Sequence, residues 1–144
     1  MKIKIIQLIM VLAGVFSTLS FAEKNPSLPP AKSQGQTQFI SGGIGKIESE
    51  AMLHGGRSWS LMLVLARAAG TGAEYISDVH VTIKDERGNT ILDTVAEGPY
   101  LLVNVAPGKY SLDAAYKSIT LHRDLILGKE PGKKITLVWP GAKD

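Results

Sequence analysis

The chain has no cysteine, and that absence excludes several kinds of structure and chemistry. Disulfides, a catalytic thiol and zinc-thiolate sites are ruled out. Burial of apolar side chains and backbone hydrogen bonds must therefore hold the fold together. Histidine is also scarce, with three residues far apart and no His-Glu-x-x-His motif. The sequence accordingly predicts no metal site and no cofactor.

Charge of one sign is not in excess either. The formal net charge is +3, and Lys2 and Lys4 supply two of the 16 basic residues. Without these two, 14 basic residues stand against 13 acidic ones, a net charge of +1. No basic stripe with interleaved aromatic residues is present, so the sequence predicts no nucleic-acid partner.

Long apolar runs are missing except for one near the beginning, at residues 5–16. Lys2 and Lys4 precede this run, and the small-residue site Ser20-Phe21-Ala22 follows it. This order is typical of a signal peptide, and the run is shorter than the roughly 20 residues of a membrane-spanning helix. We expect cleavage before Glu23 and export to the periplasm or the exterior. A retained N-terminal anchor is the alternative, and the only expected attachment to a membrane.

The remaining 122 residues correspond to about one domain. A stretch rich in proline, serine, glutamine and lysine comes first, which favours flexibility. The expected divisions are a signal peptide at 1–22, a flexible leader at 23–38, a glycine-rich segment with a short helix at 39–57, a β-sandwich at 58–140 and a tail at 141–144.

The expected helix covers residues 46–53. Ile47, Ala51 and Met52 have the spacing of a shared helical face, and His54-Gly55-Gly56 suits a helix end. The preceding Ser41-Gly42-Gly43-Ile44-Gly45 stretch invites a phosphate-binding interpretation, because amides at a helix N-terminus bind anions. The stretch lacks the Gly-Lys-Ser/Thr ending of a P-loop. We therefore expect it to be a flexible connection into the helix.

Short strands account for the rest of the chain. Val79, Val81 and Ile83 alternate with polar residues, which indicates a strand with one buried face. The turn at 85–89 predicts a hairpin with 90–95. Pro107-Gly108 suits a type II turn, which requires a positive φ at Gly108. Further expectations are a strand buried on both faces at 59–66, a small-residue loop at 68–73, strands at 100–105 and 110–116, and a final pair formed by 121–127 and 135–139.

Six or seven short strands at this spacing predict an all-β antiparallel sandwich. Two motifs then suggest a family: Val79-His80-Val81-Thr82-Ile83-Lys84-Asp85 leading to Gly88-Asn89-Thr90, and Val105-Ala106-Pro107-Gly108-Lys109-Tyr110. This order of strand, D-x-x-G turn, strand and PPGxY-type turn resembles the carboxypeptidase regulatory-like domain, a transthyretin-like Greek-key sandwich. The resemblance covers about residues 59–139, with Ala106 in place of the first proline. It implies a non-catalytic module for folding, docking or ligand presentation.

Histidine chemistry is the alternative to a binding role. Asp78 would share a strand face with His80, and Asp124 with His122, because each pair is two residues apart. A small hydrolase or metal-site enzyme using His80 and His122 is therefore one hypothesis. Polar side chains on a solvated sheet face explain the same residues more simply, and we expect no catalysis from them.

Aromatic residues beside loops are the remaining candidates for a binding surface. Tyr75 and Tyr100 have such positions, whereas Tyr110 and Trp139 follow inward strand periods and are expected in the core. The sequence thus predicts an exported, non-catalytic module that docks to an envelope protein. Its candidate contacts are Tyr75, Tyr100, His80 and His122. A glycan-binding module is the second hypothesis, because sugars stack on exposed aromatic rings.

Overall fold

The structure is a computed structural model that describes residues 27–141. The expected signal peptide and residues 142–144 of the expected tail lie outside the described residues. Within residues 27–141 the elements are β1 (Lys32–Gln34), β2 (Thr37–Gly42), α1 (Lys46–Gly55), a 3-10 helix (Gly56–Ser58), β3 (Leu61–Ala69), β4 (Gly72–Tyr75), β5 (Val79–Asp85), β6 (Thr90–Ala96), β7 (Tyr100–Asn104), β8 (Gly108–Tyr116), β9 (Ile119–Leu127) and β10 (Lys133–Trp139).

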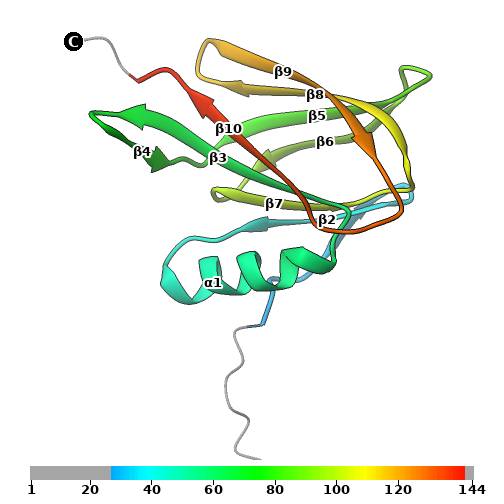
Figure 1. The fold of residues 1–144 in the computed structure, drawn as a ribbon, viewed down its shortest axis with the longest axis horizontal. Coiled ribbons are helices and arrows are strands. Elements are labelled where there is room, and N and C mark those ends of the chain that lie inside the picture. The colour runs from blue at the N-terminus through cyan, green and yellow to red at the C-terminus, as the bar shows by residue number, and fades with distance from the viewer. Residues whose placement is uncertain (1–26, 142–144) are drawn as a thin grey trace, which may run out of the picture.

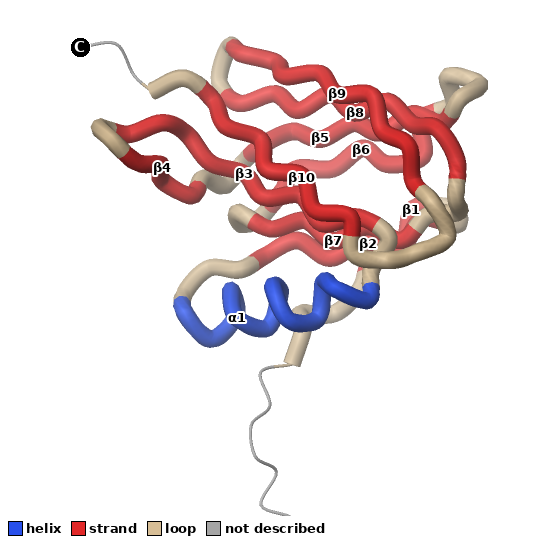
Figure 2. Tube along the Cα trace, viewed as in Figure 1, coloured by secondary structure: helices blue, strands red, loops and turns tan. Residues whose placement is uncertain are grey.

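The strands form two sheets that lie face to face (Figure 1). The first sheet has the order β1-β2-β7-β3-β10, with β4 also paired to β3, and the second has the order β6-β5-β8-β9. The helix α1 lies against the outer face of the first sheet, beside β2 and β7 (Figure 2). An all-β, sandwich-like fold with one short helix is therefore confirmed.

The main core lies between the two sheets, where strand alternation directs apolar side chains inward. Val79, Val81 and Ile83 of β5 are at most 1% exposed, while His80 between them is exposed. Leu112 of β8 and Leu101 of β7 belong to the same cluster. The predicted alternation in 79–83 and the hairpin with β6 are both confirmed.

The strand β3 is buried on both faces, as its unbroken apolar run predicts. Leu63 and Leu65 belong to the core between the sheets, whereas Met62 and Val64 belong to a second cluster that includes Met52 of α1. Each side of this strand therefore contributes to a different apolar layer. The strand holds the helix and the sandwich together.

The helix begins at Lys46 as predicted and continues to Gly55. Ala51 and Met52 are buried, but Ile47 is 72% exposed, so its predicted place on the buried face is wrong. Lys46 and Ile47 at the start of the helix are exposed, whereas Glu48 and Ser49 are half-buried. Helical spacing alone therefore does not show which residues at the start of the helix are covered by the rest of the fold.

Part of the expected flexible leader is strand. Lys32–Gln34 forms β1, which pairs with β2, and β2 pairs with β7 of the first sheet. The first sheet therefore begins at residue 32, whereas the sequence predicted that the β-sandwich begins at residue 58. Backbone pairing of β1 to β2, whose Phe39 and Ile40 are buried, explains the difference, because it orders a segment that carries little apolar surface of its own.

A side chain joins the edges of the two sheets. Gln34 of β1 donates from Nε2 to the carbonyl of Asp93 on β6 at 2.7 Å, and the Asp93 amide donates to Gln34 Oε1 at 2.8 Å. The primary amide of Gln34 thus satisfies both backbone groups of one residue at the edge of β6.

Three local predictions differ from the structure. The segment 68–73, expected as a loop, forms most of the β3–β4 hairpin. The strands β9 and β10 do not pair as a hairpin: β9 pairs with β8, and β10 crosses to the first sheet and runs parallel to β3. Gly108 is not among the glycines with positive φ, so the type II turn at Pro107-Gly108 is wrong.

No helix within residues 27–141 has the length and apolar composition needed to cross a membrane.

Candidate functional site

The candidate site lies where β3 changes its partner on one edge. Over Leu61 to Val64 that edge pairs with β7, and over Ala66 to Ala69 it pairs with β4. Leu65 lies at the junction, where its amide donates to the Pro99 carbonyl at 2.8 Å and its carbonyl accepts from the Ile76 amide at 3.1 Å. The hollow lies at this junction, between the end of β4 and the beginning of β7.

We call this hollow the Tyr75 pocket. Its volume is about 450 Å³, and no charged side chain lines it. Two other hollows in the described part of the chain include charged residues such as Arg67 and Lys117, or Glu86 and Lys109. The lining residues of the Tyr75 pocket are Gly43, Ile44, Gly45, Ser49, Tyr75, Ile76, Ser77, Pro99 and Tyr100.

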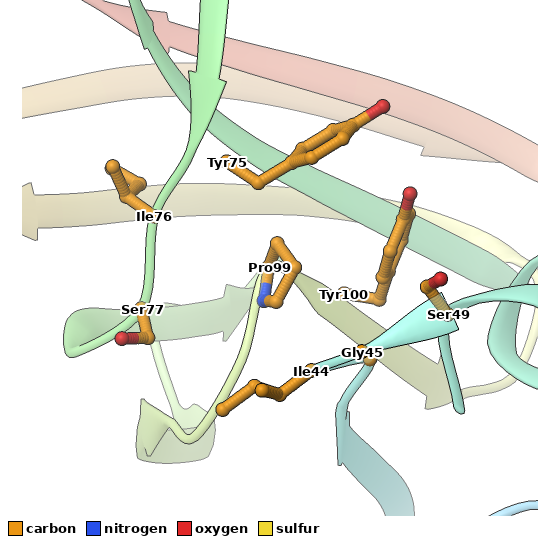
Figure 3. A pocket seen from close by; sticks show the side chains of 9 residues that line it. Ile44, Gly45, Ser49, Tyr75, Ile76, Ser77, Pro99 and Tyr100 are labelled. Carbon is orange, nitrogen blue, oxygen red and sulfur yellow. The ribbon is translucent and has the colours of Figure 1, made fainter. Parts of the chain in front are cut away.

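The two tyrosines form the aromatic part of the pocket. Tyr75 is 66% exposed and Tyr100 is 3% exposed, and their ring centroids are 5.8 Å apart at an interplanar angle of 42°. Figure 3 shows both hydroxyls directed to the same side, with Pro99 beside the rings. One ring is therefore available to a ligand, and the other forms a buried wall.

Burial raises the pKa of the Tyr100 phenol to about 12, and the neighbouring Tyr75 hydroxyl adds to this effect. A phenol in this position keeps its proton at neutral pH. Tyr100 can therefore donate a hydrogen bond, and it does not serve as a base.

The glycine-rich segment forms the opposite rim. Gly43 has φ 94° and Gly45 has φ 83°, values that favour glycine. The Gly43 amide donates to Glu48 Oε1 at 2.8 Å. The Glu48 carboxylate therefore accepts the hydrogen bond that a bound phosphate would need from this amide. This favours a connection into the helix over a phosphate-binding loop.

The two histidines lie away from this pocket, on the outer face of the second sheet. His80 faces Ala115 of β8 on one side, and His122 faces Asp113 of the same strand on the other. One strand thus separates them, which is about 10 Å between the strand axes. The structure does not bring His80 and His122 together.

Each histidine has its own carboxylate partner. His80 Nε2 pairs with Asp93 of β6, and His122 lies 2.7 Å from Asp113 through Nδ1 and 3.1 Å from Asp124 through Nε2. The hydrogen bond to Asp113 and, to a smaller degree, the hydrogen bond to Asp124 raise the pKa of His122. Within residues 27–141, no group of three or more histidine, aspartate or glutamate side chains has a geometry that could hold a metal ion.

The predicted neighbours of the histidines are half correct. Asp124 contacts His122, but Asp78 does not contact His80, because Asp78 precedes β5 with φ 61° and breaks the strand alternation. The partners Asp93 and Asp113 were not predicted. A register shift between Ile83 and Lys84 places Asp93 opposite Thr82, close to His80. A regular continuation from the 85–89 turn would place Asp93 opposite Val81, on the other face, so this partner could not be predicted from the sequence.

Sequence reasoning found the tyrosines but missed Ile44, Ile76 and Pro99. Ile44 carries the clearest signal, since a large apolar residue between two glycines has no regular strand or helix to bury it. It is 68% exposed at the rim of the pocket. The expected core positions of Tyr110 and Trp139 are confirmed, since Trp139 is 1% exposed and Tyr110 packs against the core.

No family model, no curated protein and no solved structure matches this chain.

Proposed function

We propose that this domain is an exported, non-catalytic module that docks to another protein of the cell envelope. The observation that carries the proposal is the Tyr75 pocket with its exposed apolar rim. Ile44 and Tyr75 are each about two-thirds exposed and stand on either side of an uncharged hollow. Apolar side chains exposed around one hollow are typical of an interaction site.

The chemistry of the pocket supports binding rather than catalysis. General-base catalysis requires a base within hydrogen-bond reach of the group it activates. The Ser49 hydroxyl in the pocket donates to the Lys46 carbonyl at 3.0 Å, and Tyr100 retains its proton. His80 and His122 lie on the other sheet. Hydroxyls and apolar surface can bind a ligand without transforming it.

The finer fold type is part of the proposal: a transthyretin-like Greek-key sandwich of the carboxypeptidase regulatory-like kind. Its support is the path of the chain from β5 to β8. The strands β5 and β6 form a hairpin, the chain crosses to the first sheet as β7, and it returns as β8 beside β5. This out-and-back connection is characteristic of Greek keys. Export is proposed from the order of features in residues 1–22.

A glycan is the second candidate ligand, because of one specific observation. The pocket combines the exposed ring of Tyr75 with the hydroxyls of Ser49 and Ser77 and has no charged lining. Neutral sugars use such combinations of stacking and hydrogen bonding. A polysaccharide pull-down with a Tyr75→Ala control tests this candidate.

Site-specific photo-crosslinking in the native envelope tests the docking proposal. A photoreactive residue at Ile44 reports on the pocket, and one at Ile126 is the matched control, since both isoleucines are 68% exposed and Ile126 lies on β9. We expect one defined protein adduct from Ile44 and none from Ile126. Equal adducts at both positions, or none at Ile44, would contradict docking at the Tyr75 pocket.

A further inference from the structure

We propose that the free edge of β4 binds an extended peptide of the partner protein as an added strand, and that an uncharged apolar side chain of this peptide fills the Tyr75 pocket. The inference rests on the proposed docking function and specifies how the partner is recognised. Strand addition draws affinity from main-chain hydrogen bonds and specificity from side-chain pockets.

The first argument is the unpaired edge of β4. Among the described residues, β4 pairs with β3 alone, and all four of its residues are exposed. The Ile76 amide donates to the Leu65 carbonyl of β3, so the backbone groups of Ile76 point toward β3. Successive residues direct their backbone groups to opposite edges. Ala73 and Tyr75 therefore direct their amides and carbonyls away from β3.

The second argument is the place that an added strand would occupy. The strands β7 and β4 follow one another along the same edge of β3. Next to β7 lies β2, which ends at Gly42 opposite Tyr100. A strand added to β4 would therefore lie roughly in line with β2, and its end would meet the Gly43-Ile44-Gly45 rim of the pocket. The free edge and the pocket form one continuous site.

The third argument is electrostatic. None of the nine residues lining the pocket carries a charge. Burying a charged group without a partner is costly, so the inserted side chain is expected to be neutral. The rings of Tyr75 and Tyr100, with Ile44, Ile76 and Pro99, complement an aliphatic or aromatic side chain.

A second copy of this chain fits the same site less well. Antiparallel pairing of β4 with its copy would bring the neighbour's Gly70-Thr71-Gly72 turn toward the pocket. That turn has no large apolar side chain to insert. A separate apolar peptide can satisfy both the edge and the pocket.

The test uses the full chain and a phage library of random peptides of about nine residues, from which the best binder is synthesised. An Ala73→Pro variant removes one outward N–H, a change that edge strands tolerate. Ala73→Val is the matched control, because it keeps the N–H. Melting temperatures verify that both variants fold, and Tyr75→Ala is a second variant that leaves the backbone donors intact.

We expect selected peptides with uncharged apolar residues, at least tenfold weaker binding to Ala73→Pro and to Tyr75→Ala, and unchanged binding to Ala73→Val. A peptide N-methylated at alternate amides should also bind at least tenfold more weakly. Equal binding to Ala73→Pro and to wild type would overturn strand addition. A wild-type dimer that Ala73→Pro converts to monomer would overturn the partner peptide as the occupant of the edge. Persistence of the Ile44 protein adduct in Ala73→Pro would overturn strand addition while leaving the docking function standing.

Discussion

Gly43 and Gly45 share a positive φ but have different surroundings. A Cβ added at Gly43 would collide with the ring of buried Tyr100, whereas a Cβ added at Gly45 would meet open space. The two positions therefore separate the cost of backbone strain from the cost of a steric collision.

We expect Gly45→Ala to lower the free energy of unfolding by about 1–3 kcal/mol, because its φ of 83° and ψ of 163° lie in a region essentially restricted to glycine. Gly43→Ala should cost about 1–3 kcal/mol more, because overpacking against Tyr100 adds to the strain of its own positive φ. Urea denaturation of both variants measures the difference. Equal losses would show that Tyr100 moves aside freely.

Gly108 is the contrasting case. Its φ is not positive, and the nearest atoms to an added Cβ belong to the Tyr110 ring at 3.7 Å, an ordinary contact distance. Gly108→Val should therefore change the free energy of unfolding by less than Gly45→Ala. A larger loss in a thermal melt would contradict the strand conformation observed at Gly108.

His122 makes the stability of the domain depend on pH. The two aspartates raise its pKa in the folded state above the unfolded value of about 6.5. Protonated His122 therefore stabilises the fold fully below that unfolded value, and the contribution is lost as the pH rises through the folded pKa.

We expect His122→Gln to be destabilised relative to wild type at about pH 6 and to be much closer to it at about pH 9. Denaturant unfolding at both pH values gives the comparison. Asp113→Asn should reduce the same pH dependence, because it removes the largest cause of the shift. A gap between His122→Gln and wild type that does not change with pH would exclude this linkage.

At the scale of elements, burial in α1 is concentrated late in the helix. Met52 is fully buried between the helix and the first sheet, while Ile47 is 72% exposed. The helix is therefore attached by a small number of side chains.

Met52→Ala should cost about 2–5 kcal/mol, as expected for truncation of a buried methionine. Ile47→Ser should remain within about 0.5 kcal/mol of wild type, because it changes an exposed surface. Thermal and urea unfolding of the two variants check the contrast. A loss from Ile47→Ser comparable to that from Met52→Ala would place the first turn against the sheet.

The elements that could be predicted from the sequence are those whose signal is local. Alternation in β5 and the unbroken apolar run of β3 depend on burial that repeats along a single strand. The parallel pairing of β10 with β3 depends on a partner far away in the sequence. The Tyr75 pocket was missed as a unit for the same reason: Tyr75 and Tyr100 were candidates, but only the end-to-end pairing of β4 and β7 with β3 brings Tyr75 beside Tyr100 and Ile44.

At the scale of the molecule, Gln34 connects the edges of the two sheets. It makes two hydrogen bonds with the backbone of Asp93, at 2.7 and 2.8 Å. Its loss would free one backbone amide and one carbonyl at the edge of β6. The contact therefore contributes to closing the sandwich on that side.

Gln34→Ala should lower the free energy of unfolding by about 1–2 kcal/mol, since two hydrogen bonds are removed at an exposed edge. Amide exchange at Asp93 should accelerate, and the neighbouring Ser33→Ala change is the control. Hydrogen exchange followed by NMR resolves that amide. Unchanged protection at Asp93 in Gln34→Ala would mean that the amide is held by other contacts.

The parallel pairing of β10 with β3 also has a consequence for the rate of folding. Seven residues of β10 pair with β3 across most of the domain's sequence, and Leu137 and Trp139 complete the core. Contacts between distant segments must form against a large loss of chain entropy, so all-β proteins of this kind fold over milliseconds to seconds. For a chain that we propose is exported, slow closure by β10 delays completion of the fold.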